Sequence, residues 1–331
     1  MSEAKILYLV IPCYNEEEML PITNPVLIEK MNALIGSGKI SSKSRIAYVN
    51  DGSRDRTWEL IEKYSEENEL VTGISLSRNR GHQNALLAGL HTVCGYCDLT
   101  ISLDADLQDD INAVDEMIER FYEGYEIVYG VRSSRAKDTF FKRNTALAFY
   151  KLMKLLGADI IYNHADYRLM SKRAVEALME FDEYNIFLRG LVPLVGFKQT
   201  TVSYARNERV AGESKYPFKK MLSFALDGIT SFSVKPIRMI MSIGVFIFMF
   251  SIVMLIYSLI RHFTGHTEIG WSSLIISIWA IGGLQLLAIG VVVEYIGKIY
   301  METKHRPKFI IDRFLEEEIN SADKKLTKPR E

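Results

Sequence analysis

The segment TISLDADLQDD, residues 100–110, decides how this 331-residue chain folds and what it can bind. An apolar run from Leu99 to Leu103 predicts a buried β-strand. Four aspartates follow that strand closely: Asp104, Asp106, Asp109 and Asp110. Carboxylates this close together raise each other's pKa unless a cation lies between them. The segment therefore predicts a strand that carries a cation site at its carboxyl end.

Similar apolar runs alternate with helical patterns over the first part of the chain. Strands are predicted over residues 6–11, 45–49, 71–76, 99–103 and 126–131, and helices over 25–34, 56–66, 83–91 and 111–122. Continuous apolar strands that alternate with helices indicate an α/β fold with a mostly parallel sheet, covered on both faces.

Polar side chains follow four of these strands at the point where each strand ends. They are Asn15 and Glu16, Asp51, Arg78 and Asn79, and Asp104. Ligands of open parallel sheets bind beyond the carboxyl ends of the strands. We therefore expect these side chains to line one crevice.

Motif spacing limits what this crevice can bind. The sequence contains no GxGxxG after the first strand and no GxxxxGK[ST], which disfavours dinucleotide and P-loop phosphate sites. An EF-hand pattern that starts at Asp104 fails at its sixth and twelfth positions, Asp109 and Asp115. The remaining prediction is Mg²⁺ or Mn²⁺ on Asp104, Asp106 and Gln108, completed by the phosphates of a ligand. For Asp109 and Asp110 we expect a different role, as caps of the following helix.

The composition changes after about residue 235. Residues 239–260 and 272–293 contain no charged side chain, and 22 helical residues span about 33 Å, enough for a hydrocarbon core of about 30 Å. Basic residues lie on the outer flanks: Lys219, Lys220, Lys235 and Arg238 before the first span, and Lys298, Lys304, Arg306 and Lys308 after the second. The positive-inside rule then places both flanks in the cytoplasm. We predict a two-helix transmembrane hairpin in the cytoplasmic membrane.

These patterns divide the chain into four parts. An α/β domain is expected over residues 1–215, an interfacial amphipathic helix over 216–235, the two membrane helices over 236–300, and a charged cytoplasmic tail over 301–331. A domain-capping helix is the alternative for 216–235. With 40 basic and 41 acidic residues, the chain has no global field that would favour a nucleic-acid partner.

Six segments occur in an order that points to a known family. They are IPCYNEE (11–17), VNDGSRDRT (49–57), SRNRGHQNALLAGL (77–90), SLDADLQDD (102–110), GVRSSR (130–135) and RVAGESKYPFKKM (209–221). Together they resemble the family-2 glycosyltransferases of the GT-A (Rossmann-like) fold. More narrowly, they resemble the polyprenyl-phosphate glycosyltransferases, the group of dolichol-phosphate-mannose synthase and the bactoprenol glucosyltransferases. Asp110 departs from the proline that many relatives have after DADLQD.

The resemblance implies a role for each matching residue. Nucleotide-sugar contacts would come from Pro12, Tyr14, Glu16, Asp51, Arg78 and Asp104, and metal contacts from Asp104, Asp106 and Gln108. The lipid phosphate would bind Arg132, Arg143, Arg209, Ser214 and Lys215. Catalytic roles would fall to Asp106, Arg132 and Asp166, with Asp166 orienting the acceptor or taking a proton. The alternative for Asp166 is a plain ion pair with Arg168.

The implied reaction is the inverting transfer of a sugar from a nucleotide sugar, UDP-glucose or UDP-N-acetylglucosamine (UDP-GlcNAc), to undecaprenyl phosphate. It would supply sugars for glycosylation of the cell envelope. The resemblance also implies that copies of the chain can form homo-oligomers. Two alternatives stay open: a processive polysaccharide synthase, although no QxxRW segment occurs, and a membrane-tethered nucleotide-sugar sensor without activity.

Overall fold

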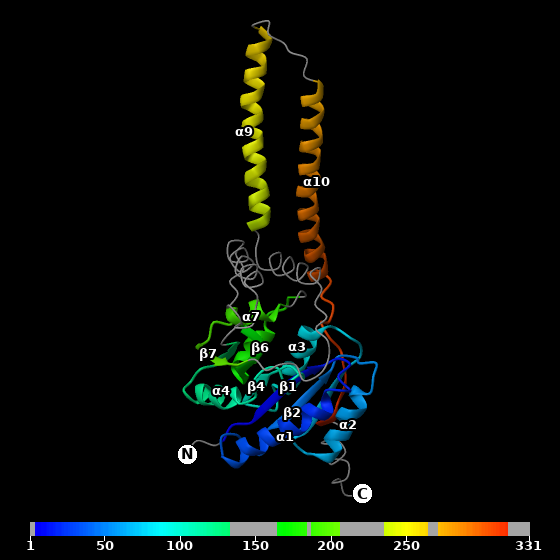
Figure 1. The fold of residues 1–331 in the computed structure, drawn as a ribbon, viewed down its shortest axis with the longest axis vertical. Helices are drawn as coiled ribbons and strands as arrows, with labels where there is room; N and C mark the ends of the chain where they lie inside the picture. The colour runs from blue at the N-terminus through cyan, green and yellow to red at the C-terminus, as the bar shows by residue number, and fades with distance from the viewer. Residues whose placement is uncertain (1–3, 133–163, 184–186, 206–234, 264–270, 317–331) are drawn as a thin grey trace, which may run out of the picture. The chain divides into compact units, whose positions relative to one another are not determined.

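A computed structural model describes residues 4–132, 164–183, 187–205, 235–263 and 271–316 (Figure 1). The chain divides into two compact units. Unit 1 comprises Met1–Ala146, Ile161–Lys215 and Arg306–Glu331, and unit 2 comprises Leu147–Ile160 and Tyr216–His305.

Unit 1 is built on one eight-stranded sheet. Its strands are β1 (Leu7–Cys13), β2 (Arg45–Asn50), β3 (Val71–Leu76), β4 (Leu99–Ser102), β5 (Ile127–Arg132), β6 (His164–Ser171), β7 (Gln199–Tyr204) and β8 (Ile311–Phe314). They lie in the order β7-β5-β6-β4-β1-β2-β3-β8. All pairs are parallel except those of β6 with β4 and β5 and of β8 with β3. The predicted α/β fold with a mostly parallel sheet is confirmed, and this sheet is consistent with the GT-A fold.

The central strands are buried on both faces, which explains their continuous apolar sequences. On β1, Leu7, Leu9 and Ile11 belong to a core cluster shared with Met31 of α1 and Met117 of α4. Val10 points to the opposite face, because side chains alternate along a strand. There a Cβ on Gly89 of α3 would lie only 2.5 Å from Val10 Cγ1. Helices therefore cover both faces of the sheet.

Six helices of unit 1 are described. They are α1 (Leu20–Gly36), α2 (Thr57–Glu67), α3 (His82–Val93), α4 (Ala113–Tyr122), α6 (Lys172–Met179) and α7 (Leu188–Leu194). The first four correspond to the four predicted helices. Helices α6 and α7 and strands β6 to β8 were not predicted from the sequence.

Strand β8 lies in the part of the chain that was expected to be a charged tail. It pairs with β3 so that Phe314 lies opposite Ile74. Tyr8 Oη donates to the Glu316 carboxylate at 2.8 Å, and Leu315 is buried in the core cluster. Residues 311–316 are thus an edge of the sheet of unit 1 rather than a tail.

Unit 2 contains the apolar part of the chain. Helices α9 (Lys235–Phe263) and α10 (Trp271–Glu302) lie side by side (Figure 1). Among the described residues, one stretch, Ile281–Glu302 with 22 residues, is long and apolar enough to cross a membrane. The two-helix transmembrane hairpin is therefore not confirmed. The predicted interfacial helix, residues 216–235, and the chain after 316 lie outside the described residues, except for Lys235.

Candidate active site

The loops after β1 and β2 interlock at the carboxyl edge of the sheet. Asn15 N donates to Ser53 Oγ at 3.0 Å, and Arg54 N donates to Asn15 Oδ1 at 2.9 Å. Glu16 N donates to Thr57 Oγ1 at 2.8 Å. Pro12 is buried in β1, whereas 43% of Tyr14 is exposed. Of the residues expected to contact the nucleotide, Tyr14 therefore offers an aromatic face to a ligand.

Asp51, at the end of β2, forms hydrogen bonds with the loop between β3 and α3. Its carboxylate accepts from Arg80 N at 2.6 Å and from Gly81 N at 2.9 Å. Burial raises the pKa of Asp51, and these two backbone donors oppose the rise. Arg78, in the same loop, is exposed. Asp51 thus has a structural task, and its contact with a nucleotide stays a prediction.

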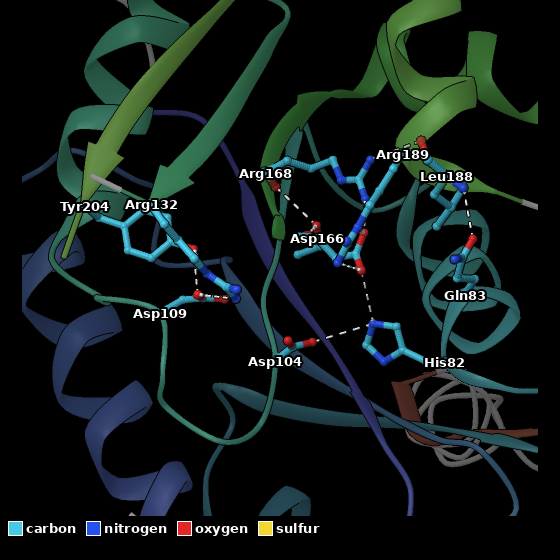
Figure 2. A network of polar contacts seen from close by, with 11 residues as sticks. His82, Gln83, Asp104, Asp109, Arg132, Asp166, Arg168, Leu188, Arg189 and Tyr204 are labelled. Atoms are coloured by element: carbon cyan, nitrogen blue, oxygen red, sulfur yellow. Dashed lines mark hydrogen bonds and ion pairs between the residues drawn. The ribbon is translucent and has the colours of Figure 1, made fainter. Parts of the chain in front are cut away.

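The predicted metal ligands follow β4 in a tight turn. Leu107 adopts a left-handed conformation with φ 52°, and Gln108 N donates to Asp106 Oδ1 at 3.2 Å. Asp104 faces His82 of α3, whose Nε2 lies 3.5 Å from Asp104 Oδ1 (Figure 2). The three predicted ligands, Asp104, Asp106 and Gln108, therefore lie on one loop.

The electrostatic surroundings of Asp104 fit a cation. Burial, together with the carboxylates of Asp166, Asp109 and Asp106, raises its pKa to about 6, although His82 opposes the rise. A cation between these groups would remove that repulsion. Among the described residues, no group of three or more His, Cys, Asp or Glu is placed to hold a metal. The donors fit Mg²⁺ or Mn²⁺ bound through few protein oxygens, with ligand phosphates and water completing the shell.

Asp166 enters the same site from β6. The antiparallel pairing of β6 with β4 places Arg168 opposite Ser102, and Ser102 Oγ donates to Asp166 O at 2.6 Å. Arg168 Nη2 donates to Asp166 Oδ1 at 2.6 Å, and Arg189 Nη2 of α7 donates to Oδ2 at 3.2 Å. His82 Nε2 lies 3.7 Å from Oδ2, so that Asp166 lies between the arginines and His82 (Figure 2).

This environment decides which role suits Asp166. Burial would raise its pKa, but Arg189, Arg168 and His82 outweigh burial and hold the pKa well below its usual range. A general base works best when its pKa lies near the operating pH. The pairing with Arg168 that the sequence left as the alternative is present. The low pKa makes removal of a proton by Asp166 unfavourable, and its orientation of the acceptor stays a prediction.

Arg132 belongs to a second polar cluster at the end of β5. Its Nη2 donates to Asp109 Oδ1 at 3.3 Å, and Tyr204 Oη of β7 donates to the same oxygen at 2.5 Å (Figure 2). The expectation that Asp109 caps the next helix is wrong, because α4 begins only at Ala113 and Asp109 pairs with Arg132 instead. Asp110 does not cap the helix either: its Oδ1 accepts from Asn112 N at 2.9 Å, but the N-cap residue of α4 is Asn112.

Four of the predicted phosphate-binding residues lie outside the described residues. They are Arg143, Arg209, Ser214 and Lys215. In turn, the structure places His82, Arg189 and Tyr204 against predicted site residues, and none of the three was selected from the sequence. His82 could have been found, because it lies three residues after Asn79, in the segment that follows a predicted strand. Arg189 and Tyr204 lie on α7 and β7, which were not predicted.

Comparison with known proteins assigns the chain to a family. The family model described as glycosyl transferase family 2 matches residues 8–179. An uncharacterized glycosyltransferase of Bacillus subtilis, YkoT, is 55% identical over 307 residues, which cover 93% of this chain and 91% of that protein.

Two further relatives have names that state an activity. A bactoprenol glucosyl transferase of Shigella phage SfV is 40% identical over 92% of this chain and 97% of its own length. A prophage bactoprenol glucosyl transferase homolog of Escherichia coli is 39% identical over 92% of this chain and 98% of its own. The chain belongs to glycosyl transferase family 2.

Proposed function

We propose that this protein transfers a sugar from a nucleotide sugar to a polyprenyl phosphate, with undecaprenyl phosphate as acceptor and UDP-glucose or UDP-GlcNAc as donor. The observation that carries the proposal is the extent of the likeness to the bactoprenol glucosyl transferases. An alignment of 308 residues cannot fit into the residues before 236, so it includes part of unit 2 as well as the sheet. The relatives that are named for a reaction on bactoprenol thus resemble this chain over both units.

The crevice supports the two halves of the reaction. Tyr14 and Glu16 lie at the end of β1, where they would contact the nucleotide, with Asp51 and Arg78 beside them. Asp104, Asp106 and Gln108 would hold Mg²⁺ or Mn²⁺. When bound, the cation would neutralise the diphosphate that leaves. Arg132 provides a planar donor of the kind that binds phosphate bidentately.

The proposed acceptor needs no strong base, which agrees with the low pKa of Asp166. A phosphate monoester has its second pKa near 6 and is largely a dianion at neutral pH. Its oxygen can attack the anomeric carbon without first losing a proton. A new carbon–oxygen bond forms to the lipid phosphate, the bond to the nucleoside diphosphate breaks on the opposite side, and the anomeric configuration inverts. Positioning and charge, rather than a strong base, would then supply most of the acceleration.

Unit 2 supports the assignment to the cytoplasmic membrane. Large apolar side chains on both helices are exposed, for example Phe246 of α9 at 73% and Leu286 of α10 at 72%. Exposed apolar surface of this kind suits contact with lipid. We propose that α9 and α10 form a two-helix anchor, with the catalytic unit and both chain ends in the cytoplasm.

A product assay tests the function. Full-length protein in vesicles that contain undecaprenyl phosphate would be incubated with single radiolabelled nucleotide sugars and Mg²⁺ or Mn²⁺. We expect one solvent-extractable lipid with the mass of a monoglycosylated undecaprenyl phosphate. A polymeric product would support the processive synthase instead, and binding without product would support the sensor.

A further inference from the structure

The feature that leads to a further inference is the pair of arginines on Asp166. Arg168 Nη2 contacts Asp166 Oδ1 at 2.6 Å, while Arg189 contacts both oxygens more loosely, from Nε at 3.3 Å and from Nη2 at 3.2 Å. The two guanidiniums also differ in burial. Only 2% of the Arg168 side chain is exposed, against 34% of the Arg189 side chain.

Arg168 alone is enough to neutralise the charge of the buried Asp166 carboxylate. One buried guanidinium balances one buried carboxylate, and Arg168 Nη1 also donates to Leu188 O at 3.3 Å. The ion pair with Asp166 therefore does not by itself account for a second, more exposed arginine at this position.

The backbone beside Arg189 is held by two hydrogen bonds at Leu188. Leu188 N donates to Gln83 Oε1 at 2.9 Å, and Leu188 O accepts from Arg168. Gln83 is adjacent to His82, which faces Asp104 (Figure 2). The neighbours of Arg189 thus hold it near the predicted cation site. A ligand that binds Arg189 would therefore pay little conformational entropy to order it.

The charge of Asp166 restricts what can lie beside it. A carboxylate that pairs with two guanidiniums, as Asp166 does, repels a phosphate unless a cationic group lies between the two. A guanidinium is suited to that position, because it can donate to a carboxylate with some of its N–H groups and to a phosphate with others. Of the two arginines on Asp166, only Arg189 is exposed enough to reach a ligand.

We propose that Arg189 binds a phosphate group of a substrate and that Asp166 holds its guanidinium in place. This inference rests on the proposed function, because it names a further residue for the same reaction. The phosphate is either that of the lipid acceptor or the diphosphate of the donor, and the experiment below distinguishes the two.

The first test measures steady-state kinetics of the full-length protein in vesicles. We expect Arg189→Gln to raise the KM for its phosphate-bearing substrate about tenfold or more, with Arg189→Lys intermediate because it keeps the charge but loses the fork. Arg173→Gln is the matched control, since Arg173 lies on α6, is 68% exposed and pairs with Glu126. A higher KM for the lipid alone identifies the acceptor phosphate, and a higher KM for the nucleotide sugar alone identifies the diphosphate. A change confined to kcat, or no change, would overturn the proposal.

A second test separates phosphate binding from a purely structural role. If Arg189 only orients Asp166, Arg189→Gln should have no further effect in an Asp166→Asn background. If Arg189 contacts phosphate, the rise in KM should persist there. The absence of any further effect would count against the inference.

A third test does not depend on turnover or on the folding of the Asp166 variant. Binding of farnesyl phosphate against farnesol, and of UDP against uridine, would be measured on full-length wild type and Arg189→Gln. We expect wild type to prefer at least one phosphate form and the variant to lose that preference. Retention of both preferences, or their absence in wild type, would refute the proposal. If the preference is lost as expected but wild type makes no glycolipid with any donor, then the proposed function fails and the phosphate site does not.

Discussion

Two carboxylates of the crevice, Asp104 and Asp166, have opposite electrostatic surroundings. Asp166 faces two guanidiniums, which keep its pKa below its usual range. Asp104 faces other carboxylates and a single His82, and its pKa is raised to about 6. Arg168 and Arg189 neutralise the charge of Asp166. Among the residues that the structure describes, no guanidinium is one of the groups that shift the pKa of Asp104 most, so its charge calls for another cation. A bound cation would meet that need, and the difference supports the proposal that Asp104, but not Asp166, is a metal ligand.

Loss of Asp106 tests the cation site by activity. We expect Asp106→Ala to lower transfer by at least ~100-fold and to abolish the cation dependence of donor binding, because several kcal/mol of charge stabilisation would be lost. Asp312→Ala, an exposed aspartate on β8, is the control. Donor binding would be measured by calorimetry with and without Mn²⁺. Full activity in chelator-treated wild type would contradict the assignment.

The raised pKa of Asp104 predicts how cation binding changes with pH. Between its ordinary value of 3.8 and about 6, the folded protein holds this proton more tightly than the unfolded chain. Without a cation, Asp104 therefore makes the free energy of unfolding fall as the pH rises through this window. A cation needs the ionised form, so stabilisation by Mn²⁺ should be nearly complete at about pH 7.5 and weak at about pH 5.

Thermal unfolding with and without Mn²⁺ at both pH values checks this prediction. In Asp104→Asn the carboxylate is absent, and we expect little stabilisation at either pH. Equal stabilisation of wild type at the two pH values would show that Asp104 does not control cation binding.

At the scale of elements, the crevice depends on contacts between the loops at the strand ends. Gly52, directly after β2, has φ +62°, and a Cβ there would lie 2.5 Å from Asn79 N. The loop between β3 and α3 approaches Gly52 this closely because Asp51 binds Arg80 N and Gly81 N. The glycine and the carboxylate together hold the loop that carries Arg78.

Gly52→Ala should therefore displace the loop between β3 and α3. We expect a loss of about 2 kcal/mol or more in the free energy of unfolding, from the strained φ and the backbone clash, together with weaker nucleotide binding. Gly95→Ala is the control, because no atom lies within 4 Å of its added Cβ. Chemical denaturation and nucleotide titration of both variants measure the difference. Similar stabilities for the two variants would contradict the model of a fixed loop.

The same elements show how far the sequence could predict the site. Strands β1 to β5 are mainly apolar runs, so their positions in the chain and their polar ends followed directly, including Asp51 and Asp104. Strand β6 carries Asp166 and Arg168 among apolar residues, because these two side chains contact Arg189 and Leu188 O of α7 inside the protein. No periodic pattern marks such a strand. Asp109 was misjudged for a related reason: its partners, Arg132 and Tyr204, are distant in the sequence.

At the scale of the whole molecule, the chain returns to unit 1 after the apolar helices. Residues 306–316 follow unit 2 in the sequence but add β8 to the sheet edge at β3. Ser77 N donates to Ile310 O at 3.0 Å, and Lys308 Nζ donates to Phe181 O at 2.9 Å. Phe314 is 5% exposed and packs edge-on against Tyr96. The catalytic unit is therefore complete only with a segment from beyond the apolar helices.

This arrangement predicts the outcome of two different deletions. A chain that ends at residue 235 lacks β8 and exposes the edge of β3, with its unpaired backbone groups. A chain in which a flexible Gly/Ser linker replaces residues 236–305 keeps β8 and the burial of Phe314 and Leu315. Burial of one large apolar side chain contributes about 1.5–3 kcal/mol. We expect the linked form to be more stable by several kcal/mol and less prone to aggregate.

Chemical denaturation and size-exclusion chromatography of the two deletions measure this difference. Phe314→Ala in the linked form is the matched variant, because it retains the segment but creates a cavity that should cost about 3–5 kcal/mol. The linked form should bind nucleotide yet modify undecaprenyl phosphate in vesicles poorly, since it lacks both apolar helices. If the chain that ends at 235 is as stable as the linked form, then β8 does not support the sheet. If the linked form glycosylates vesicle lipid efficiently, then α9 and α10 are not needed to bring the enzyme to its acceptor.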